Sequence, residues 1–211
     1  MTLPLSDFLP VWGFLAANIV SPGPNVLNTI ALAMGSGRGA GMGSASGVGL
    51  GIGMWCIVMT LGASAVIGAV PHLQVALTVV AAGLLLWFAW RYFRAALAGR
   101  RARTMRLPSA SEGLSFRDGF RRALVVNAIN PKALTSWLAI LGLFPVARAS
   151  AADVAILCAG ACLLSFSIHS LYTLAFSSPA AVRAYLRAGW ALQALAGVLF
   201  TGFALRLLVA A

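Results

Sequence analysis

Two short windows of this chain, residues 18–28 and 127–131, hold its asparagines beside prolines. Asn18 precedes Pro22 by four residues, and Asn127 precedes Pro131 by four, at a constant offset of 109 residues. Proline removes a backbone donor and clashes with the preceding helical turn, so we expect a helix break in each window. A break frees backbone groups that can bind a ligand. The five Asn of the chain all lie in these windows: Asn18, Asn25, Asn28, Asn127 and Asn130.

Two titratable side chains add further chemistry. Lys132, the only lysine among 15 basic residues, follows Pro131 directly. A cation near the centre of a bilayer costs about 2.5–3.5 kcal/mol and indicates a function, so Lys132 is predicted to attract a substrate carboxylate. The alternative is a lysine that neutralises the carbonyl end of a helix. His169 shares a helix face with Tyr172 and Thr173, and histidine ordinarily titrates near neutrality, which makes His169 the candidate for proton coupling. The alternative is that these polar side chains bond neighbouring backbone.

The composition determines the class of protein. Of 211 residues, 61% are hydrophobic and 9% charged, with a mean hydropathy of +0.93, whereas soluble domains carry about 25% charged residues. Such hydrophobicity excludes disorder, and three Cys in apolar runs exclude a disulfide framework. The sequence has no G-x-S-x-G, no H-E-x-x-H and no intramembrane pair of carboxylates, so we expect neither an enzyme nor a cofactor or metal site. An integral membrane protein remains.

Six apolar runs are long enough to cross a bilayer, which takes about 20 residues each. We therefore expect an all-α membrane protein with six transmembrane helices. No positively charged region or cleavage site marks the start as a signal peptide. The expected spans, bounded by Gly, Pro and charge, are Phe8–Met34, Gly39–Val70, Leu73–Phe93, Phe116–Pro145, Val154–Phe176 and Val182–Leu208.

The net charge of +11 is distributed unevenly among the connections. One alternating set of connections contains twelve Arg, including Arg103 and Arg106, and the other contains Arg148 and Arg206. Basic loops stay in the cytoplasm, so we expect a cytoplasmic linker and both termini outside. The basic cluster is interpreted as orientation and contact with anionic membrane lipids. Nucleic acid is not an expected partner, since no interleaved aromatics or soluble module would carry it.

The linker divides the chain into two similar halves. We expect a single transmembrane domain with repeat one at about 1–96, the linker at about 97–115 and repeat two at about 116–211. Two units of three spans joined in sequence enter the membrane with opposite polarity, as in inverted-repeat transporters. The paired Asn-x-x-x-Pro windows then lie in the first helix of each repeat. Identity elsewhere at this offset is thin, so the repeat rests on the motif and the span count.

Both breaks are expected near the middle of the membrane. Pro22 lies about fourteen residues into its span and Pro131 about fifteen, or roughly 20 Å along a helix. Unpaired backbone in hydrocarbon costs several kcal/mol, so a break persists only where protein buries it or a cavity adjoins it. Gly23 adds backbone freedom to the first break, and Pro24 follows it. The alternative is an ordinary proline kink at each position, with its free backbone groups bonded by Asn side chains. Two matched breaks in corresponding spans favour a binding site over this alternative.

Glycines follow a regular spacing in the second span. Gly35, Gly39, Gly43, Gly47 and Gly51 recur every four residues, and a second row is interrupted only by Ala45. Small-residue ridges let membrane helices approach closely. We expect tight packing against the broken helices, with a sliding surface as the alternative. The ridge is no phosphate-binding loop, because no strand precedes it and no Gly-Lys-Ser/Thr follows.

The motifs Ser21-Pro22-Gly23-Pro24-Asn25 and Asn127-x-x-Asn130-Pro131-Lys132-Ala133, with Phe116-Arg117-Asp118-Gly119-Phe120 and the glycine-spaced span, resemble the LysE/RhtB translocator family of bacterial amino acid exporters. The resemblance implies an inner-membrane exporter driven by protons or membrane potential, with a homodimer as one form that such proteins take. It carries a binding role onto Pro22, Gly23, Pro24 and Asn25, and onto Asn130, Pro131 and Lys132.

Three hypotheses about function follow. The first is secondary export of a small amino acid, neutral or zwitterionic because the four acids lie at span ends or in the linker, with substrate between Asn18, 22–25 and 127–132. The two repeats would rock to expose the site alternately. The second is a membrane redox or lipid-modifying enzyme on a similar bundle, which would need reactive thiols or an acid and base pair. The third is a passive channel or assembly subunit.

Overall fold

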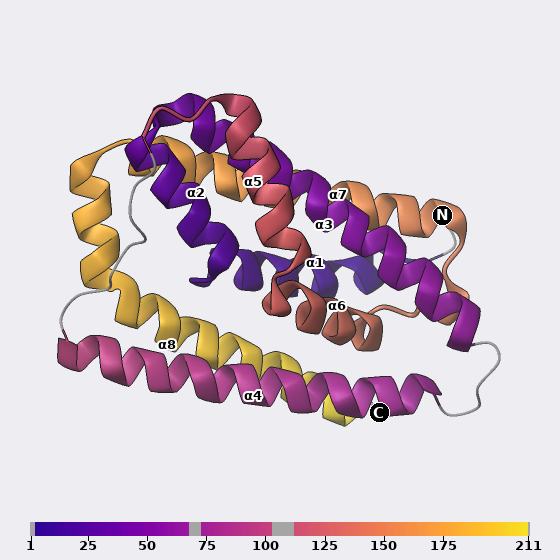
Figure 1. Cartoon of the computed structure of the whole chain (residues 1–211). Helices are drawn as coiled ribbons and strands as arrows, with labels where there is room; N and C mark the ends of the chain where they lie inside the picture. The colour runs from indigo at the N-terminus through magenta and orange to yellow at the C-terminus, as the bar shows by residue number, and fades with distance from the viewer. Residues whose placement is uncertain (1–2, 68–72, 103–111, 211) are drawn as a thin grey trace.

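The structure is a computed structural model that describes residues 3–67, 73–102 and 112–210, and these residues are mainly helical (Figure 1). Arg103, Arg106 and the middle of the predicted linker lie outside the described residues. The elements in chain order are α1 Leu5–Val20, α2 Pro24–Gly35, α3 Gly37–Ile67, α4 Leu73–Ala102, α5 Phe116–Ala128, α6 Pro131–Leu143, the 3₁₀ turn η1 Val146–Arg148, α7 Ala151–Phe176 and α8 Pro179–Ala210.

Both predicted breaks are present. α1 ends before Ser21, whose φ of −69° and ψ of 138° are extended, and α2 begins at Pro24. The second break separates α5 from α6, which begins at Pro131 and is bent by 60° relative to α5. Pro24 and Pro131 occupy the start of the following helix, where the missing N–H is not needed. Proline thus ends one helix and begins the next.

Four helices of the described residues are long and apolar enough to cross a membrane, and a fifth span results if α5 and α6 count as one. The four are α3, α4, α7 and α8. The first predicted span, Phe8–Met34, is divided into the short helices α1 and α2, neither of which reaches the length of a span by itself. The fold is therefore an all-helical membrane protein with four to five candidate spans, and the count of six stays a prediction.

α4 is longer than predicted. It continues to Ala102, nine residues beyond the expected end at Phe93, and so covers the start of the predicted linker. Charge after Phe93 signals the end of the apolar run, but the residues there still favour a helix. Cations on aromatic faces accompany this extension: the Arg94 guanidinium lies 4.7 Å from the centre of the Trp90 ring, and that of Arg100 lies 5.8 Å from the Trp190 ring of α8.

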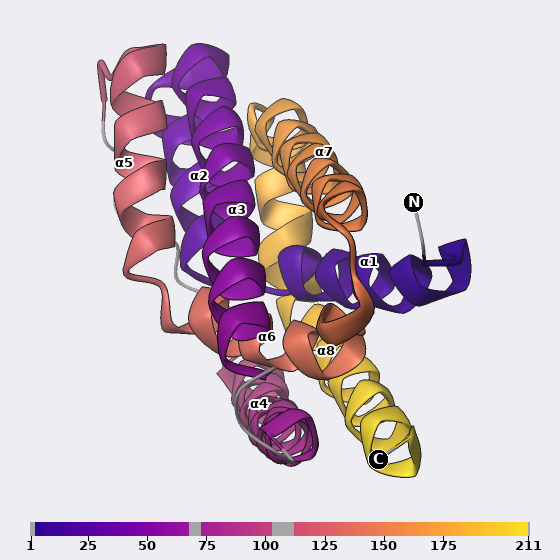
Figure 2. The ribbon, with the colours of Figure 1, turned by 90° about the vertical axis from the view of Figure 1, so that its right-hand side faces the viewer.

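The helices form two groups with α1 and α6 between them. α3 lies between α5 and α7, and α4 packs along α8 (Figure 2). Figure 1 shows α1 and α2 running from right to left and α5 and α6 from left to right, with the breaks near the centre. The two broken pairs are therefore antiparallel.

The glycine spacing of α3 explains its close packing. A Cβ at Gly43 would collide with the Phe116 carbonyl of α5, and one at Gly51 with the Asn127 amide. The second row faces α7, because a Cβ at Gly53 would lie 2.5 Å from Cys162 Sγ. Tight packing of the glycine span against a broken helix is confirmed, and this packing sets the distance between α3 and the second break.

The basic residues are distributed unevenly between the two ends of the helical bundle. Figure 1 shows the end of α2, the start of α3, the end of α4 and the start of α8 together at the left, while both chain ends lie toward the right. The left-hand end therefore holds the Arg-rich helix ends, and the opposite end holds few basic residues. At the first end lie Arg38, Arg100 and Arg183, and at the second Arg148 and Arg206.

Candidate functional site

A lysine ammonium caps the carbonyl end of α1. Lys132 Nζ, from the first turn of α6, donates to Asn18 O at 2.7 Å, to Ser21 O at 3.0 Å and to Ser21 Oγ at 2.7 Å. An ammonium has three N–H donors, so each of them has a protein acceptor. The carbonyls at a helix C-terminus carry partial negative charge, which the cation offsets. Lys132 thus joins the two breaks in this conformation.

Two tyrosines complete the cap. Tyr172 of α7 donates to Val20 O at 2.9 Å, and Tyr92 of α4 lies 2.9 Å from Ser21 Oγ and 3.4 Å from Pro22 O. The carbonyls that the break releases are therefore bonded by side chains from three other helices. This explains how peptide groups remain satisfied in the middle of the fold.

Asparagines join the broken helices crosswise. Asn18 of α1 donates to Ser136 Oγ of α6 at 2.7 Å, and Asn25 of α2 donates to Asn127 Oδ1 of α5 at 2.8 Å. Asn130 caps α6, because its side chain accepts from the Lys132 N–H at 3.0 Å. The breaks are therefore one connected site that includes members of both predicted windows.

Gly23 has a role other than the predicted backbone freedom. Its φ of −170° and ψ of 178° are extended, a conformation open to any residue. A Cβ there would lie 3.2 Å from both Cδ and Nζ of Lys132. The missing side chain therefore makes room for the lysine that bonds the end of α1.

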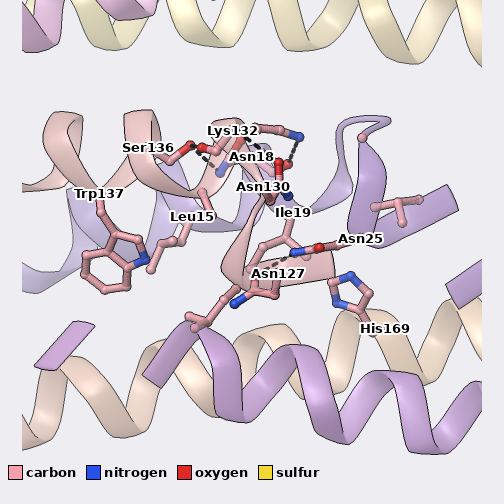
Figure 3. A pocket seen from close by; sticks show the side chains of 14 residues that line it. Leu15, Asn18, Ile19, Asn25, Asn127, Asn130, Lys132, Ser136, Trp137 and His169 are labelled. Carbon is pink, nitrogen blue, oxygen red and sulfur yellow. Dashed lines mark hydrogen bonds between the residues drawn. The ribbon is translucent and has the colours of Figure 1, made fainter. Parts of the chain in front are cut away.

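A small cavity of about 40 Å³ lies between the two breaks (Figure 3). Space of this size holds about three waters, whereas ligand pockets measure about 300–1,000 Å³. Of the predicted binding residues, those that line it are Asn18, Gly23, Asn25, Asn127, Asn130 and Lys132. The conformation is closed at this point, and an organic ligand requires the helices to separate.

Three buried acceptors line this small cavity without a hydrogen-bond partner. They are Asn18 Oδ1, Asn25 Oδ1 and His169 Nε2. His169 is 1% exposed, and its Nδ1 lies 2.9 Å from Ser165 O. A carbonyl only accepts, so the proton is on Nδ1 and Nε2 is left as an acceptor. Three unpaired acceptors beside one cavity favour a ligand that donates hydrogen bonds, such as an ammonium group.

The prolines face a second, larger cavity of about 340 Å³. Pro22, Pro24 and Pro131 line it on the side of the breaks, and Trp87 and Arg91 of α4 line it on the other side. Gly23, Asn130 and Lys132 adjoin both cavities. The predicted site residues thus lie together, but they divide between two spaces that share Lys132.

Sequence reasoning missed three polar partners of these residues. Tyr92 resembles an aromatic residue at a membrane interface, and Ser136 and Trp55 resemble ordinary helix residues. Trp55 of α3 donates to Asn127 O at 3.2 Å, and so bonds a carbonyl at the second break. The signal that could have found Tyr92 is its position beside Arg91, directly after the apolar run of residues 79–90.

The cysteines contribute packing. Cys56, Cys158 and Cys162 are free thiols, and they lie on α3 and α7. Cys158 Sγ lies 3.7 Å from Gly53 O, and Cys162 faces Gly53. Their small side chains fill the interface with the second glycine row.

The two breaks, with a cation and unpaired acceptors between them, agree with what a comparison with known families shows. The family of LysE type translocators matches residues 16–211. The chain belongs to the LysE type translocator family. This family consists of transporters, so the protein is a translocator with membrane-spanning helices. No curated protein and no solved structure matches the chain.

Proposed function

We propose that this LysE type translocator exports a small amino acid, neutral or zwitterionic, across the bacterial inner membrane by alternating access. The observation that carries the proposal is the site between the breaks, where Lys132 and three unpaired acceptors adjoin one cavity. A free amino acid has a carboxylate for the cation and three N–H donors for the acceptors. The two sets of groups are complementary.

The ammonium of the substrate would bind Asn18 Oδ1, Asn25 Oδ1 and His169 Nε2, which have no other partner among the described contacts. The carboxylate would bind Lys132. Because Nζ already donates to Asn18 O and to two oxygens of Ser21, it must release at least one of them to do so. Substrate binding therefore weakens the cap on α1 and couples occupancy of the site to movement of that helix.

The small volume of the site also requires the helices to move during transport. The cavity of about 40 Å³ is closed to an amino acid, so each transport cycle must open the site on one side at a time. The antiparallel course of the two broken pairs in Figure 1 supports two inverted units that rock about the breaks. The charge pattern supports an orientation with the Arg-rich end in the cytoplasm and both termini outside.

The distribution of acids favours a substrate without a positively charged side chain. Asp7, Asp118 and Asp153 lie in the first turns of α1, α5 and α7. The residues described as lining the two cavities at the breaks include no Asp or Glu. A cationic side chain would have no carboxylate partner there and would meet Lys132 instead.

His169 is proposed to couple export to protons. Its Nε2 binds either the substrate ammonium or a proton, and these two cations exclude each other at one acceptor. Release of the substrate on one side would let a proton bind, and return of the empty site would carry that proton inward. The consequence is antiport of an amino acid against a proton.

Efflux from proteoliposomes tests the proposal. Vesicles that contain the purified protein are loaded with a panel of radiolabelled amino acids and assayed with and without a pH gradient. We expect saturable efflux of at least one neutral amino acid that an inward proton gradient accelerates. Flux proportional to concentration at all concentrations would instead indicate a passive channel. Full activity of a variant that lacks all three Cys would eliminate thiol-based redox chemistry.

A further inference from the structure

The larger cavity has the chemistry of a second binding site. It adjoins both breaks and is bordered on its far side by α4 and α8 instead of α7. Its volume of about 340 Å³ falls in the range of small-molecule pockets, about 300–1,000 Å³. It therefore accommodates a molecule that the small cavity cannot hold in this conformation.

The polar groups of this cavity are arranged for a zwitterion. Arg91 lines the cavity, and its guanidinium lies 4.9 Å from the centre of the Trp87 ring. This contact holds the guanidinium in place, and its fork of N–H donors suits a carboxylate. Gln193 of α8 also lines it, and its Oε1 is buried without a hydrogen-bond partner. An unpaired buried acceptor is rare and suits an ammonium donor. No acid is among the described residues that line the cavity.

The remaining lining is mainly apolar and aromatic, with Trp87 and Phe88 on α4 and the prolines at the breaks. An apolar side chain gains by contact with such a wall, because each buried CH₂ tightens binding about fourfold. A second cation on the substrate would be repelled by Arg91 and Lys132. Shape and charge thus select the same kind of molecule.

We propose that this cavity is the loading site of the transporter, and that it selects an amino acid with an uncharged, apolar side chain. This inference rests on the proposed export function. The carboxylate binds Arg91, the ammonium binds Gln193 Oε1, and the side chain lies against Trp87 and Phe88. Lys132 adjoins both cavities, so it receives the carboxylate from Arg91 as the substrate passes to the site between the breaks.

α4 offers a matched pair of variants for the test. Arg91 stacks on Trp87 beside the cavity, and Arg94 stacks in the same way on Trp90 but does not line it. Efflux of L-leucine, L-alanine and L-lysine is measured in proteoliposomes for the wild type, Arg91→Gln and Arg94→Gln. We expect Arg91→Gln to raise the KM for leucine about tenfold, as loss of a charge-assisted hydrogen bond does, and Arg94→Gln to leave it unchanged.

A variant that gains a function distinguishes an altered binding site from a misfolded protein. Gln193→Glu places a carboxylate in the wall, and we expect it to raise lysine efflux relative to leucine efflux. The inference is overturned if the wild type prefers lysine to leucine, or if Arg91→Gln and Gln193→Glu match the wild type while amino acids are still exported. If the wild type exports none of the amino acids in the larger panel, the proposed export function fails and the inference fails with it.

Discussion

Replacement of Lys132 by alanine tests the part of the mechanism that the structure describes in most detail. The change removes an ammonium that donates to Asn18 O, Ser21 O and Ser21 Oγ. Two of these acceptors keep a partner, because Asn18 O still accepts from Ser21 Oγ and Ser21 Oγ still contacts Tyr92 OH. Ser21 O is the acceptor left without its donor.

The loss of stability should therefore be that of one charge-assisted hydrogen bond, about 1.5–3 kcal/mol, and not that of three. Export should fall much further, because the substrate carboxylate loses its cation. We expect Lys132→Ala to insert into the membrane in normal amounts, to unfold at a somewhat lower temperature and to have no measurable efflux. Lys132→Arg keeps the positive charge, but a planar guanidinium cannot direct three donors at the end of α1 as an ammonium does, so it should recover stability and export only in part.

The assay compares efflux from proteoliposomes with thermal unfolding of the same purified variants. Tyr172→Phe is the matched control, because it removes one donor from the same end of α1, at Val20 O, and Tyr172 lines neither of the two cavities at the breaks. It should lower stability and retain export. Wild-type efflux by Lys132→Ala would remove Lys132 from the mechanism, and equal loss of export in Tyr172→Phe would show that the cap alone matters.

Three further results are expected. Gly51→Ala should destabilise the protein and impair export, because the new Cβ collides with the Asn127 amide. The matched control is Gly62→Ala, whose new Cβ would have no neighbouring atom within 4 Å. In thermal unfolding, Gly62→Ala should stabilise α3 by up to about 1 kcal/mol. Asn25→Ala and Asn127→Ala should be non-additive by about 1 kcal/mol in a double-mutant cycle, and strict additivity would contradict the bond between them. His169→Gln keeps an acceptor but cannot carry a proton, so efflux should persist but no longer respond to a pH gradient. Efflux that still responds to the gradient would show that another group couples protons.

The sequence predicted the local features correctly where one residue type decides the backbone. Proline disfavours a continuous helix, and the clustered prolines and glycine at Pro22 to Pro24 and the proline at Pro131 predicted the two breaks from the sequence alone. A lone proline does not always break a helix, since Pro10 lies inside α1. The glycine spacing predicted close packing of α3, because a missing side chain permits approach whatever the neighbour is. The predicted end of α4 at Phe93 was wrong, because polarity marks where an apolar run stops and not where a helix stops.

The tertiary structure decided which groups meet at the breaks. Lys132 and Ser21 are 111 residues apart, and no pattern in the chain indicates that the ammonium of one bonds the carbonyl of the other. The role of Gly23 likewise depends on that lysine, since its backbone is extended and needs no glycine. Spacing along the chain determines local conformation through sterics, whereas partners across the fold depend on how helices pack. The chain alone therefore predicted where its helices break, and only the packed helices determined what bonds the freed carbonyls.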